Sequence, residues 1–228
     1  MTTKIERINL AFTGMRINKN NYLALVFLIF ISSSAYTQNG ENGKTCETEI
    51  DLRRNSECKV NIIALQAGTQ HYLEGNPGLE ANFVLFKKLV REAALSHSKP
   101  DLICFPEYAI SGWPYPNEEI INSIGEIIPG NGKWYQQYVE LARETGVALA
   151  GWLVEMDQEK LYNTAFIIDA KGNFKGKYRK VHANFGEQVW WGWSQGEQFN
   201  LIELDGIKYG ISICSDMWFP ETTRCEEL

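Results

Sequence analysis

The sequence is poor in histidine, in closely spaced cysteines and in positive charge, and each shortage argues against a class of protein. It has three histidines and five cysteines, and no two cysteines are spaced as Cys-x-x-Cys, which argues against a zinc framework. The formal net charge of −6 argues against a nucleic-acid-binding domain, because such domains usually carry a basic patch. With 44% hydrophobic and 22% charged residues, the 228-residue chain has ordinary globular composition and can bury one sizeable core. A chain of this length does not need the dense disulfides of a small secreted scaffold.

The chain also lacks an apolar run long enough to span a membrane, which needs about 20 residues. Its longest run, Leu23 to Ile31, has nine residues. The basic residues Arg16 and Lys19 precede it, and small residues ending at Ala35 follow it. This order is typical of a secretory signal peptide, so we predict a signal over residues 1–35 and export to the periplasm or the extracellular space. An uncleaved segment that anchors the chain to the membrane, or a buried helix, is the alternative.

Two features around the signal leave choices open. Met15 is a more natural start than Met1, because a long stretch otherwise precedes the basic residues. Residues 36–58 are polar with no apolar period, and we expect a linker there. Cys46 and Cys58 lie in this segment, and an exported chain meets an oxidising compartment, so a disulfide or two free thiols are both open.

From residue 59 onward the sequence predicts alternating strands and helices in one domain, 59–228. Apolar and β-branched runs predict strands, and apolar residues at helical spacing predict helices. Asp205-Gly206 is the turn signal of a hairpin, and Gly146 is a helix C-cap. The expected strands are 60–65, 101–105, 147–154, 161–170, 199–203 and 207–214; the expected helices are 79–94 and 134–145, with another beginning at Glu221. This order indicates a layered α/β (α+β) domain.

Cys214 is the first residue that could carry chemistry. It ends a predicted strand and precedes a sharp turn toward a helix. Backbone N–H groups and a helix dipole at such a place lower a thiol pKa and can hold an oxyanion. A small buried hydrophobe is the commoner role of cysteine, and local features alone favour that reading.

Three motifs reverse this preference. Cys214 to Glu221 reads Cys-Ser-Asp-Met-Trp-Phe-Pro-Glu, Phe105 to Tyr108 reads Phe-Pro-Glu-Tyr with Gly112 after it, and Tyr162 to His182 reads Tyr-Asn-Thr-Ala through to Lys-Tyr-Arg-Lys-Val-His. In this order and spacing they resemble the nucleophile, general-base and lysine motifs of the nitrilase (carbon-nitrogen hydrolase) superfamily. The resemblance extends from about residue 59 to the C-terminus.

The resemblance implies a division of catalytic labour. Glu107 matches the base, Lys180 the catalytic lysine and Cys214 the nucleophile. A carboxylate can take the thiol proton and later protonate the leaving amine. The lysine ammonium, with the backbone N–H of Ser215, can stabilise the oxyanion. Water then hydrolyses the thioester, so the family chemistry requires no cofactor and no metal.

Other site residues are less well determined. Family members often carry a second glutamate between the lysine and the cysteine, and Glu187 is the best candidate. Glu197 is the alternative, and either could be a surface charge. His182 could pair with Cys214 as in papain-like enzymes, but the resemblance favours a structural or hydrogen-bonding role.

Aromatic residues gather between the lysine and the nucleophile. Tyr108, Trp190 and Trp191 are the candidate lining of a substrate pocket, with Phe185 and Trp193 nearby. The same residues could equally be core or dimer surface.

The resemblance also implies the whole fold and the reaction class. Family members form a four-layer α-β-β-α sandwich, and this chain ends fourteen residues after Cys214, so we expect it to be C-terminally incomplete and poorly active. The expected substrate is a small amide or N-carbamoyl compound, favoured by the context Met217 to Pro220. The alternatives are a nitrilase acting on R–C≡N and an inactive fragment that keeps the fold. Family members usually associate through a face of the sandwich, which leaves a homo-oligomer open.

Overall fold

The computed structural model of the chain describes residues 6–7, 44–50, 60–67, 69, 78–96, 99–112 and 122–227. Apart from Glu6–Arg7, the predicted signal peptide lies outside the described residues. Among the helices that are described, none is both long and apolar enough to cross a membrane.

A seven-stranded mixed sheet forms the centre of the molecule, and its strands lie in space in the order of the sequence. The central strands β3, β4 and β5 run parallel, whereas β2, β6 and β7 each pair antiparallel with the preceding or following strand. The strands are β1 (Glu6–Arg7), β2 (Lys44–Ile50), β3 (Val60–Gln66), β4 (Leu102–Cys104), β5 (Ala148–Asp157), β6 (Lys160–Ile168) and β7 (Phe174–Arg179).

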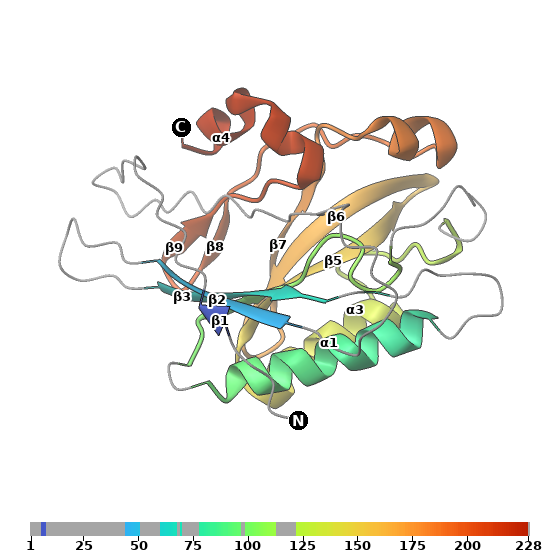
Figure 1. The fold of residues 1–228 in the computed structure, drawn as a ribbon. Helices are drawn as coiled ribbons and strands as arrows, with labels where there is room; N and C mark the ends of the chain where they lie inside the picture. The colour runs from blue at the N-terminus through green and yellow to red at the C-terminus, as the bar shows by residue number, and fades with distance from the viewer. Residues whose placement is uncertain are drawn as a thin grey trace.

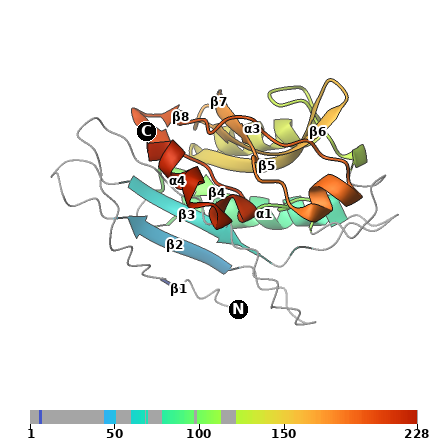
Figure 2. The ribbon, with the colours of Figure 1, turned by 90° about the horizontal axis from the view of Figure 1, so that it is seen from above.

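Strand β2 corrects the expectation that residues 36–58 form a linker and that regular structure begins at residue 59. The backbone of β2 pairs antiparallel with β3, from Lys44 opposite Gln66 to Ile50 opposite Val60, and Figure 2 shows β2 beside β3, with the short β1 outside it. The physical reason is that a polar segment near the edge of a sheet can form a strand by pairing its backbone groups with those of its neighbour. The side chains of Cys46 and Cys58 lie outside the described part, so their disulfide stays a prediction.

Two helices cover one face of the sheet, below it in Figure 1. They are α1 (Gly78–Ala94) and α3 (Lys133–Thr145), close to the predicted bounds. Their apolar sides pack against every second residue of the central strands, such as Ile103 and Phe166. The predicted C-cap is confirmed, because Gly146 has φ 64° and its N–H donates to the Ala142 carbonyl at 2.8 Å.

The other face of the sheet is covered by a hairpin, β8 (Ile202–Leu204) and β9 (Ile207–Tyr209). The predicted turn is confirmed, because Asp205 and Gly206 have φ 50° and 79° and form its two-residue loop. The strands are shorter than predicted: among the described residues only three pairs form, and Gly210–Ile213 runs on without a partner strand. Its side chains Ile211 and Ile213 are still buried against the sheet, which explains their apolar pattern.

The sheet is therefore buried on both faces, between a helix layer and the hairpin. This confirms the expected α/β class. Three short helices lie on the same side of the sheet as the hairpin. They are the π-helix η1 (Gly186–Trp190), the 3₁₀ helix η2 (Cys214–Trp218) and α4 (Pro220–Glu227). Figure 1 shows α4 on the side of the sheet opposite to α1 and α3.

Candidate active site

Strand direction brings two of the predicted catalytic residues to one edge of the sheet. Glu107 follows β4, and Lys180 directly follows β7. Because β7 is antiparallel to β6 and β6 is antiparallel to β5, β7 runs parallel to β4 and β5, so the carboxyl ends of β4 and β7 lie at the same edge. Arg179 is the last residue of β7. Its guanidinium donates two hydrogen bonds to the buried Glu155 carboxylate, at 2.6 and 2.8 Å, and these fix the end of the strand.

The structure places Glu107, Lys180 and Glu187 in direct contact. The Lys180 ammonium donates to Glu107 Oε1 at 3.0 Å and to Glu187 Oε1 at 2.9 Å, and all three side chains are fully buried or nearly so. Glu197, the alternative second glutamate, is exposed and makes none of these contacts. Of the two candidates for the second glutamate, only Glu187 contacts Lys180 in this structure.

Asn163 belongs to the same cluster and was not singled out from the sequence. Its side-chain amide donates to Glu107 Oε1 at 2.5 Å and to Glu187 Oε1. Its carbonyl oxygen accepts from the indole N–H of Trp152 at 2.6 Å. The signal was available, because Asn163 lies inside the lysine motif and on a predicted strand, but its role depends on which face of β6 it occupies.

The backbone at Glu187 is held by reciprocal hydrogen bonds at the start of η1. The Asn184 N–H donates to Glu187 Oε2 at 2.7 Å, and the Glu187 N–H donates to Asn184 Oδ1 at 3.0 Å. This is the arrangement of a capping box, which fixes the first turn of a helix. A π-turn is rare and is often found at functional sites.

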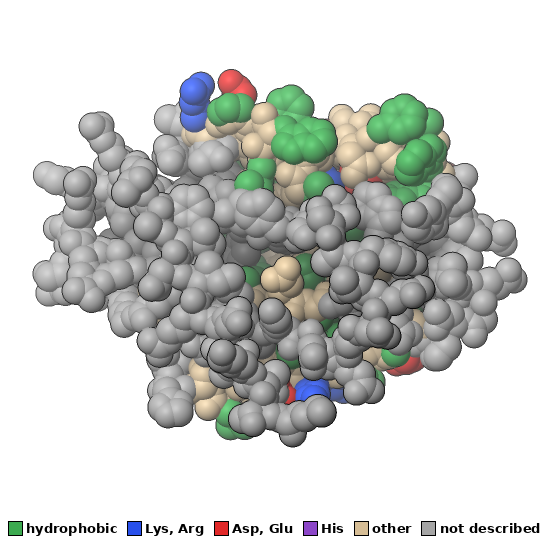
Figure 3. Space-filling view, viewed as in Figure 1, with side chains coloured by type: hydrophobic (Ala, Val, Ile, Leu, Met, Phe, Trp, Pro, Cys, Tyr) green, Lys and Arg blue, Asp and Glu red, His purple; other side chains and the backbone are tan. Residues whose placement is uncertain are grey.

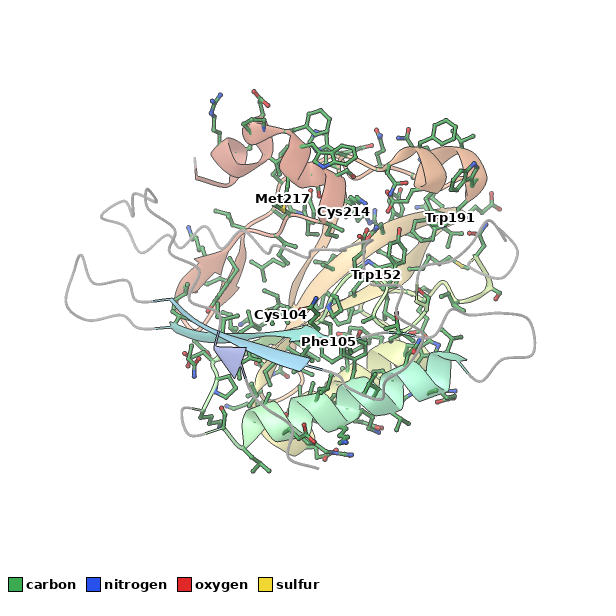
Figure 4. The ribbon with its side chains drawn as sticks, in the orientation of Figure 1. Cys104, Phe105, Trp152, Trp191, Cys214 and Met217 are labelled. Atoms are coloured by element: carbon green, nitrogen blue, oxygen red, sulfur yellow. The ribbon has the colours of Figure 1, made fainter. Side chains whose placement is uncertain are left out.

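The predicted pocket residues fall in two groups. Tyr108 and Trp191 are buried in an aromatic cluster with Trp152, and the Tyr108 hydroxyl donates to Glu187 Oε1 at 2.9 Å. Because both side chains are buried, they pack beneath the cluster of glutamates and lysine and do not line an open pocket. Trp193 is buried in the same aromatic cluster. Figure 4 shows Trp152 and Trp191 on the side of the sheet away from α1. Trp190 is 46% exposed, and it lines a cleft described below.

Cys214 lies at a strained turn. Its φ of 49° is in the left-handed region, which a non-glycine residue rarely adopts, and it begins η2 directly after the extended Ile213. The side chain is partly buried, and the backbone N–H of Ser215 donates to its sulfur. Such a turn presents a nucleophile and a backbone donor in the same place.

Asp216 holds this turn against the segment that follows Lys180. Its Oδ2 accepts from the Ile213 N–H at 2.9 Å and from the Tyr178 hydroxyl at 2.8 Å. Its Oδ1 accepts from the His182 N–H at 2.8 Å and lies 3.0 Å from His182 Nδ1. The His182 ring stacks on Phe219 with centroids 4.0 Å apart. These contacts support the structural role predicted for His182, since its ring faces Asp216.

The electrostatics of the cluster differ from the sequence-based expectation at Cys214. Burial, and next the charge of Glu107, raise the pKa of Cys214 to about 11, although Lys180 and the Ser215 N–H act in the opposite direction. The Ser215 N–H lowers this pKa, as predicted for a backbone donor, but burial and the neighbouring carboxylates outweigh it, so the pKa is raised overall and not lowered. The thiol is neutral at pH 7.

The charges on Glu107 and Lys180 are also perturbed. Burial raises the pKa of Glu107, although Lys180 and the Asn163 amide oppose this. Burial lowers the pKa of Lys180, but the carboxylates of Glu107 and Glu187 outweigh it and hold that pKa above its usual value. Lys180 therefore stays charged throughout any reaction near neutral pH, and it cannot act as the base.

The two carboxylate oxygens of Glu107 differ in their hydrogen bonds. Glu107 Oε2 is buried and has no hydrogen-bond partner among the described residues, while Oε1 accepts from both Lys180 and Asn163. A buried oxygen without a donor is costly and needs an explanation.

A cleft of about 570 Å³ opens beside the nucleophile turn, between η1 and the segment η2–α4. Its walls carry exposed aromatic side chains, and Figure 3 shows hydrophobic side chains gathered on this part of the surface. Among the described residues, no Asp, Glu, Lys or Arg lines it. The lining residues are His182, Ala183, Asn184, Phe185, Gly186, Gln188, Trp190, Gln195, Ser215, Trp218 and Phe219. No group of three or more His, Cys, Asp or Glu side chains suited to a metal ion occurs in the described part of the chain.

Comparisons with known proteins agree with this picture. A family model described as carbon-nitrogen hydrolase matches residues 63–227, a range that includes every residue of the buried cluster and Cys214. A nitrilase of Pyrococcus abyssi is 32% identical over 157 residues, which are 67% of this chain and 58% of that protein. The chain spans about half the length of most curated relatives that it matches.

Solved structures give the same result for the fold. An amidase from Nesterenkonia sp. is 22% identical with a TM-score of 0.58, and the match covers 73% of this chain and 59% of that one. Saccharomyces cerevisiae Nit3, described as a member of branch 10 of the nitrilase superfamily, is 28% identical with a TM-score of 0.57, covering 64% and 54%. These likenesses confirm the nitrilase-type fold expected from the motifs.

Proposed function

The chain belongs to the carbon-nitrogen hydrolase family, and from this premise we propose that it hydrolyses a small amide or N-carbamoyl compound through a thioester on Cys214. The observation that carries the proposal is the cluster beside Cys214: a buried glutamate with one oxygen anchored by Lys180 and the other without a hydrogen-bond partner among the described residues.

The first step couples proton transfer to attack. Because the pKa of Cys214 is raised to about 11, little thiolate exists before substrate binds. We propose that Glu107 Oε2 takes the thiol proton as the sulfur forms a bond to the substrate carbonyl carbon. The negative charge that develops on the carbonyl oxygen is stabilised by the Lys180 ammonium and the Ser215 N–H.

The second step breaks the C–N bond and the third restores the enzyme. Protonated Glu107 gives its proton to the leaving nitrogen, ammonia or an amine departs, and a thioester remains on Cys214. Water then attacks the thioester carbon while Glu107 accepts a proton from it. The acid departs and the sulfur recovers its proton, so that one amide and one water become one acid and one amine.

The cleft supports an uncharged substrate. Its walls are aromatic, none of the described residues that line it carries a carboxylate, ammonium or guanidinium group, and its lining includes Ser215, which directly follows Cys214. An aromatic or apolar substituent on the substrate could bury its surface there, whereas a substrate carboxylate would lose water without gaining a counter-charge. We therefore propose a neutral amide with an apolar substituent as the preferred class.

A nitrile is the second candidate substrate. A curated relative at 32% identity is named a nitrilase, and the same cysteine, glutamate and lysine could add a thiol to R–C≡N. A chain that keeps the fold without turnover is the non-catalytic alternative.

The test is a screen for ammonia release over neutral amides, N-carbamoyl amines and nitriles. We expect release from at least one amide, complete loss in Cys214→Ala, and no change in the matched variant Cys225→Ala, whose cysteine is exposed. Intact mass after mixing with substrate should show an acyl adduct on Cys214. Turnover by Cys214→Ala equal to that of the unmodified chain would contradict the mechanism, and release from nitriles alone would favour the second candidate.

A further inference from the structure

Asn163 stands between the two glutamates of the cluster and contacts both. Its amide donates one hydrogen bond to Glu107 Oε1 and one to Glu187 Oε1, the same two oxygens that accept from Lys180. We infer that Asn163 is a positioning residue: together with a single lysine it holds the two glutamates, and it keeps Glu107 Oε2 free for the thiol proton. Trp152 sets the orientation of its amide. This inference rests on the proposed function.

The charges in the cluster explain why a neutral donor is needed. Glu107 and Glu187 bring two negative charges, Lys180 brings one positive charge, and all are buried. The groups facing Glu107 are Lys180, Glu187, Asn163 and Cys214, and the Tyr108 hydroxyl joins them through Glu187. One carboxylate would take a proton to relieve the repulsion unless further donors stabilised both. The two N–H groups of Asn163 supply this stabilisation without adding charge.

The orientation of the amide matters because its two ends are alike in shape and opposite in polarity. If the amide were turned over, its oxygen would face two carboxylates. The indole N–H of Trp152 can only donate, and it lies 2.6 Å from Asn163 Oδ1, so it fixes the oxygen on the side away from the carboxylates. Trp152 is on β5 and only 1% of its side chain is exposed. The Tyr108 ring packs against it, with the two ring centroids 4.8 Å apart.

Loss of Asn163 should therefore change the ionisation of Glu107 and not only the packing around it. The Asn163 hydrogen bond lowers the pKa of Glu107 against burial, which raises it. Without that bond Glu107 keeps its proton to higher pH and cannot accept one from the thiol. In Asn163→Ala the acid limb of the kcat/KM profile should move to higher pH. At a pH above that limb, kcat/KM should fall less than it does on the limb.

The experiment measures kcat/KM against pH on the full chain for the unmodified protein, Asn163→Ala, Trp152→Phe and Tyr138→Phe. Tyr138→Phe is the matched control, because its hydroxyl donates to the Trp152 carbonyl from the other side of the sheet. We expect the midpoint of the acid limb to rise by about one pH unit in Asn163→Ala, the value of one charge-assisted hydrogen bond. Trp152→Phe should shift it in the same direction by less, and Tyr138→Phe not at all.

A second measurement separates failure of the inference from failure of the proposed function. Alkylation of Cys214 by iodoacetamide, followed by mass spectrometry, has an acid-side inflection in pH that reports the titration of Glu107, whether or not any amide is hydrolysed. If the chain turns over amides but neither pH profile moves in Asn163→Ala, Asn163 only fills space and the inference is wrong. If no amide is hydrolysed, the proposed function fails, and an alkylation inflection raised in Asn163→Ala still supports the positioning role.

Discussion

At the scale of single residues, the acidity of Cys214 is set by its neighbours more than by its position at a helix start. Burial and the Glu107 charge raise its pKa to about 11, while Lys180 and the Ser215 N–H oppose them. The resting sulfur therefore keeps its proton, and in the proposed mechanism the nucleophile arises only when Glu107 accepts that proton. Under this division of roles, thiol acidity and turnover need not change together in a variant.

Glu107→Gln separates the two properties. Removing the proton acceptor should lower kcat/KM for amide hydrolysis by about a hundredfold to ten-thousandfold, the usual contribution of a general base. Removing the negative charge should also lower the pKa of Cys214, so iodoacetamide should alkylate it faster at about pH 9. Ammonia release and peptide mapping measure the two effects. Glu197→Gln, which changes an exposed glutamate, should alter neither, and slower alkylation of Glu107→Gln would contradict the electrostatic account.

The sequence carried the principal site residues but not the relations between them. Glu107, Lys180 and Cys214 could be predicted because each lies in a motif with a fixed order of residue types. Asn163 lies in a motif too, yet its importance follows from a hydrogen bond to Trp152, which is eleven residues away on the neighbouring strand. The direction of the Cys214 pKa shift could not be predicted, because it depends on burial and on how near two distant carboxylates come.

At the scale of elements, the turn at η2 is held to the loop after β7 by one side chain. Asp216 is fully buried, accepts hydrogen bonds from the Ile213 N–H, the Tyr178 hydroxyl and the His182 N–H, and lies 3.0 Å from His182 Nδ1. Its loss would leave several buried donors without a partner, and the strained φ of Cys214 would lose its restraint.

We expect Asp216→Ala to lower the free energy of unfolding by about 3 kcal/mol and to abolish turnover even where the fold is retained. Urea unfolding gives the first quantity, and ammonia release at a temperature well below the unfolding midpoint gives the second. Asp157→Ala is the control, because that carboxylate is half exposed and pairs only with Arg179 among the described contacts. If Asp216→Ala unfolds like the control and retains full activity, the turn does not depend on this carboxylate.

The cleft between η1 and η2–α4 predicts a substrate preference. Trp218 is 75% exposed on its wall, so its removal should leave the fold intact. If the substrate places an aromatic group there, Trp218→Ala should lower kcat/KM for phenylacetamide about threefold to tenfold relative to acetamide, the value of one aromatic contact. Val84→Ala, which truncates a 65% exposed side chain on α1, should leave the ratio unchanged. An unchanged ratio in Trp218→Ala would place the substrate elsewhere.

Helices and strands were predicted well where the apolar periodicity was strong. They were predicted poorly where backbone pairing between strands determined the structure. The helices α1 and α3 carry regular apolar faces, and their bounds came out within a few residues. The polar strand β2 has no such pattern. It is a strand because its backbone pairs with that of β3. The strand β9 was predicted through Cys214 because Ile211 and Ile213 are apolar, but they are buried without pairing to another strand.

At the scale of the whole molecule, the layers follow from the two faces of one sheet. Alternate residues of β3, β4, β5 and β6 pack against α1 and α3 on one side and against the hairpin side chains on the other. Such continuous apolar strands are typical of parallel strands covered on both faces. Among the described residues the second β layer consists of β8 and β9, and a complete four-layer arrangement is what the family resemblance implies.

The predicted export signal concerns the whole chain, because the compartment decides which substrates and which redox conditions the protein meets. The apolar run Leu23–Ile31 would extend roughly 14 Å as a helix, less than half of the ~30 Å hydrocarbon core, so it suits a signal better than a span. We propose cleavage after Ala35. Expression of the full chain with a C-terminal tag, followed by fractionation and mass analysis, should give an exported form that begins at Tyr36, and Val26→Asp should leave the precursor uncut. A full-length form in the membrane fraction would support the anchor instead, and an uncut form in the cytoplasm would contradict export.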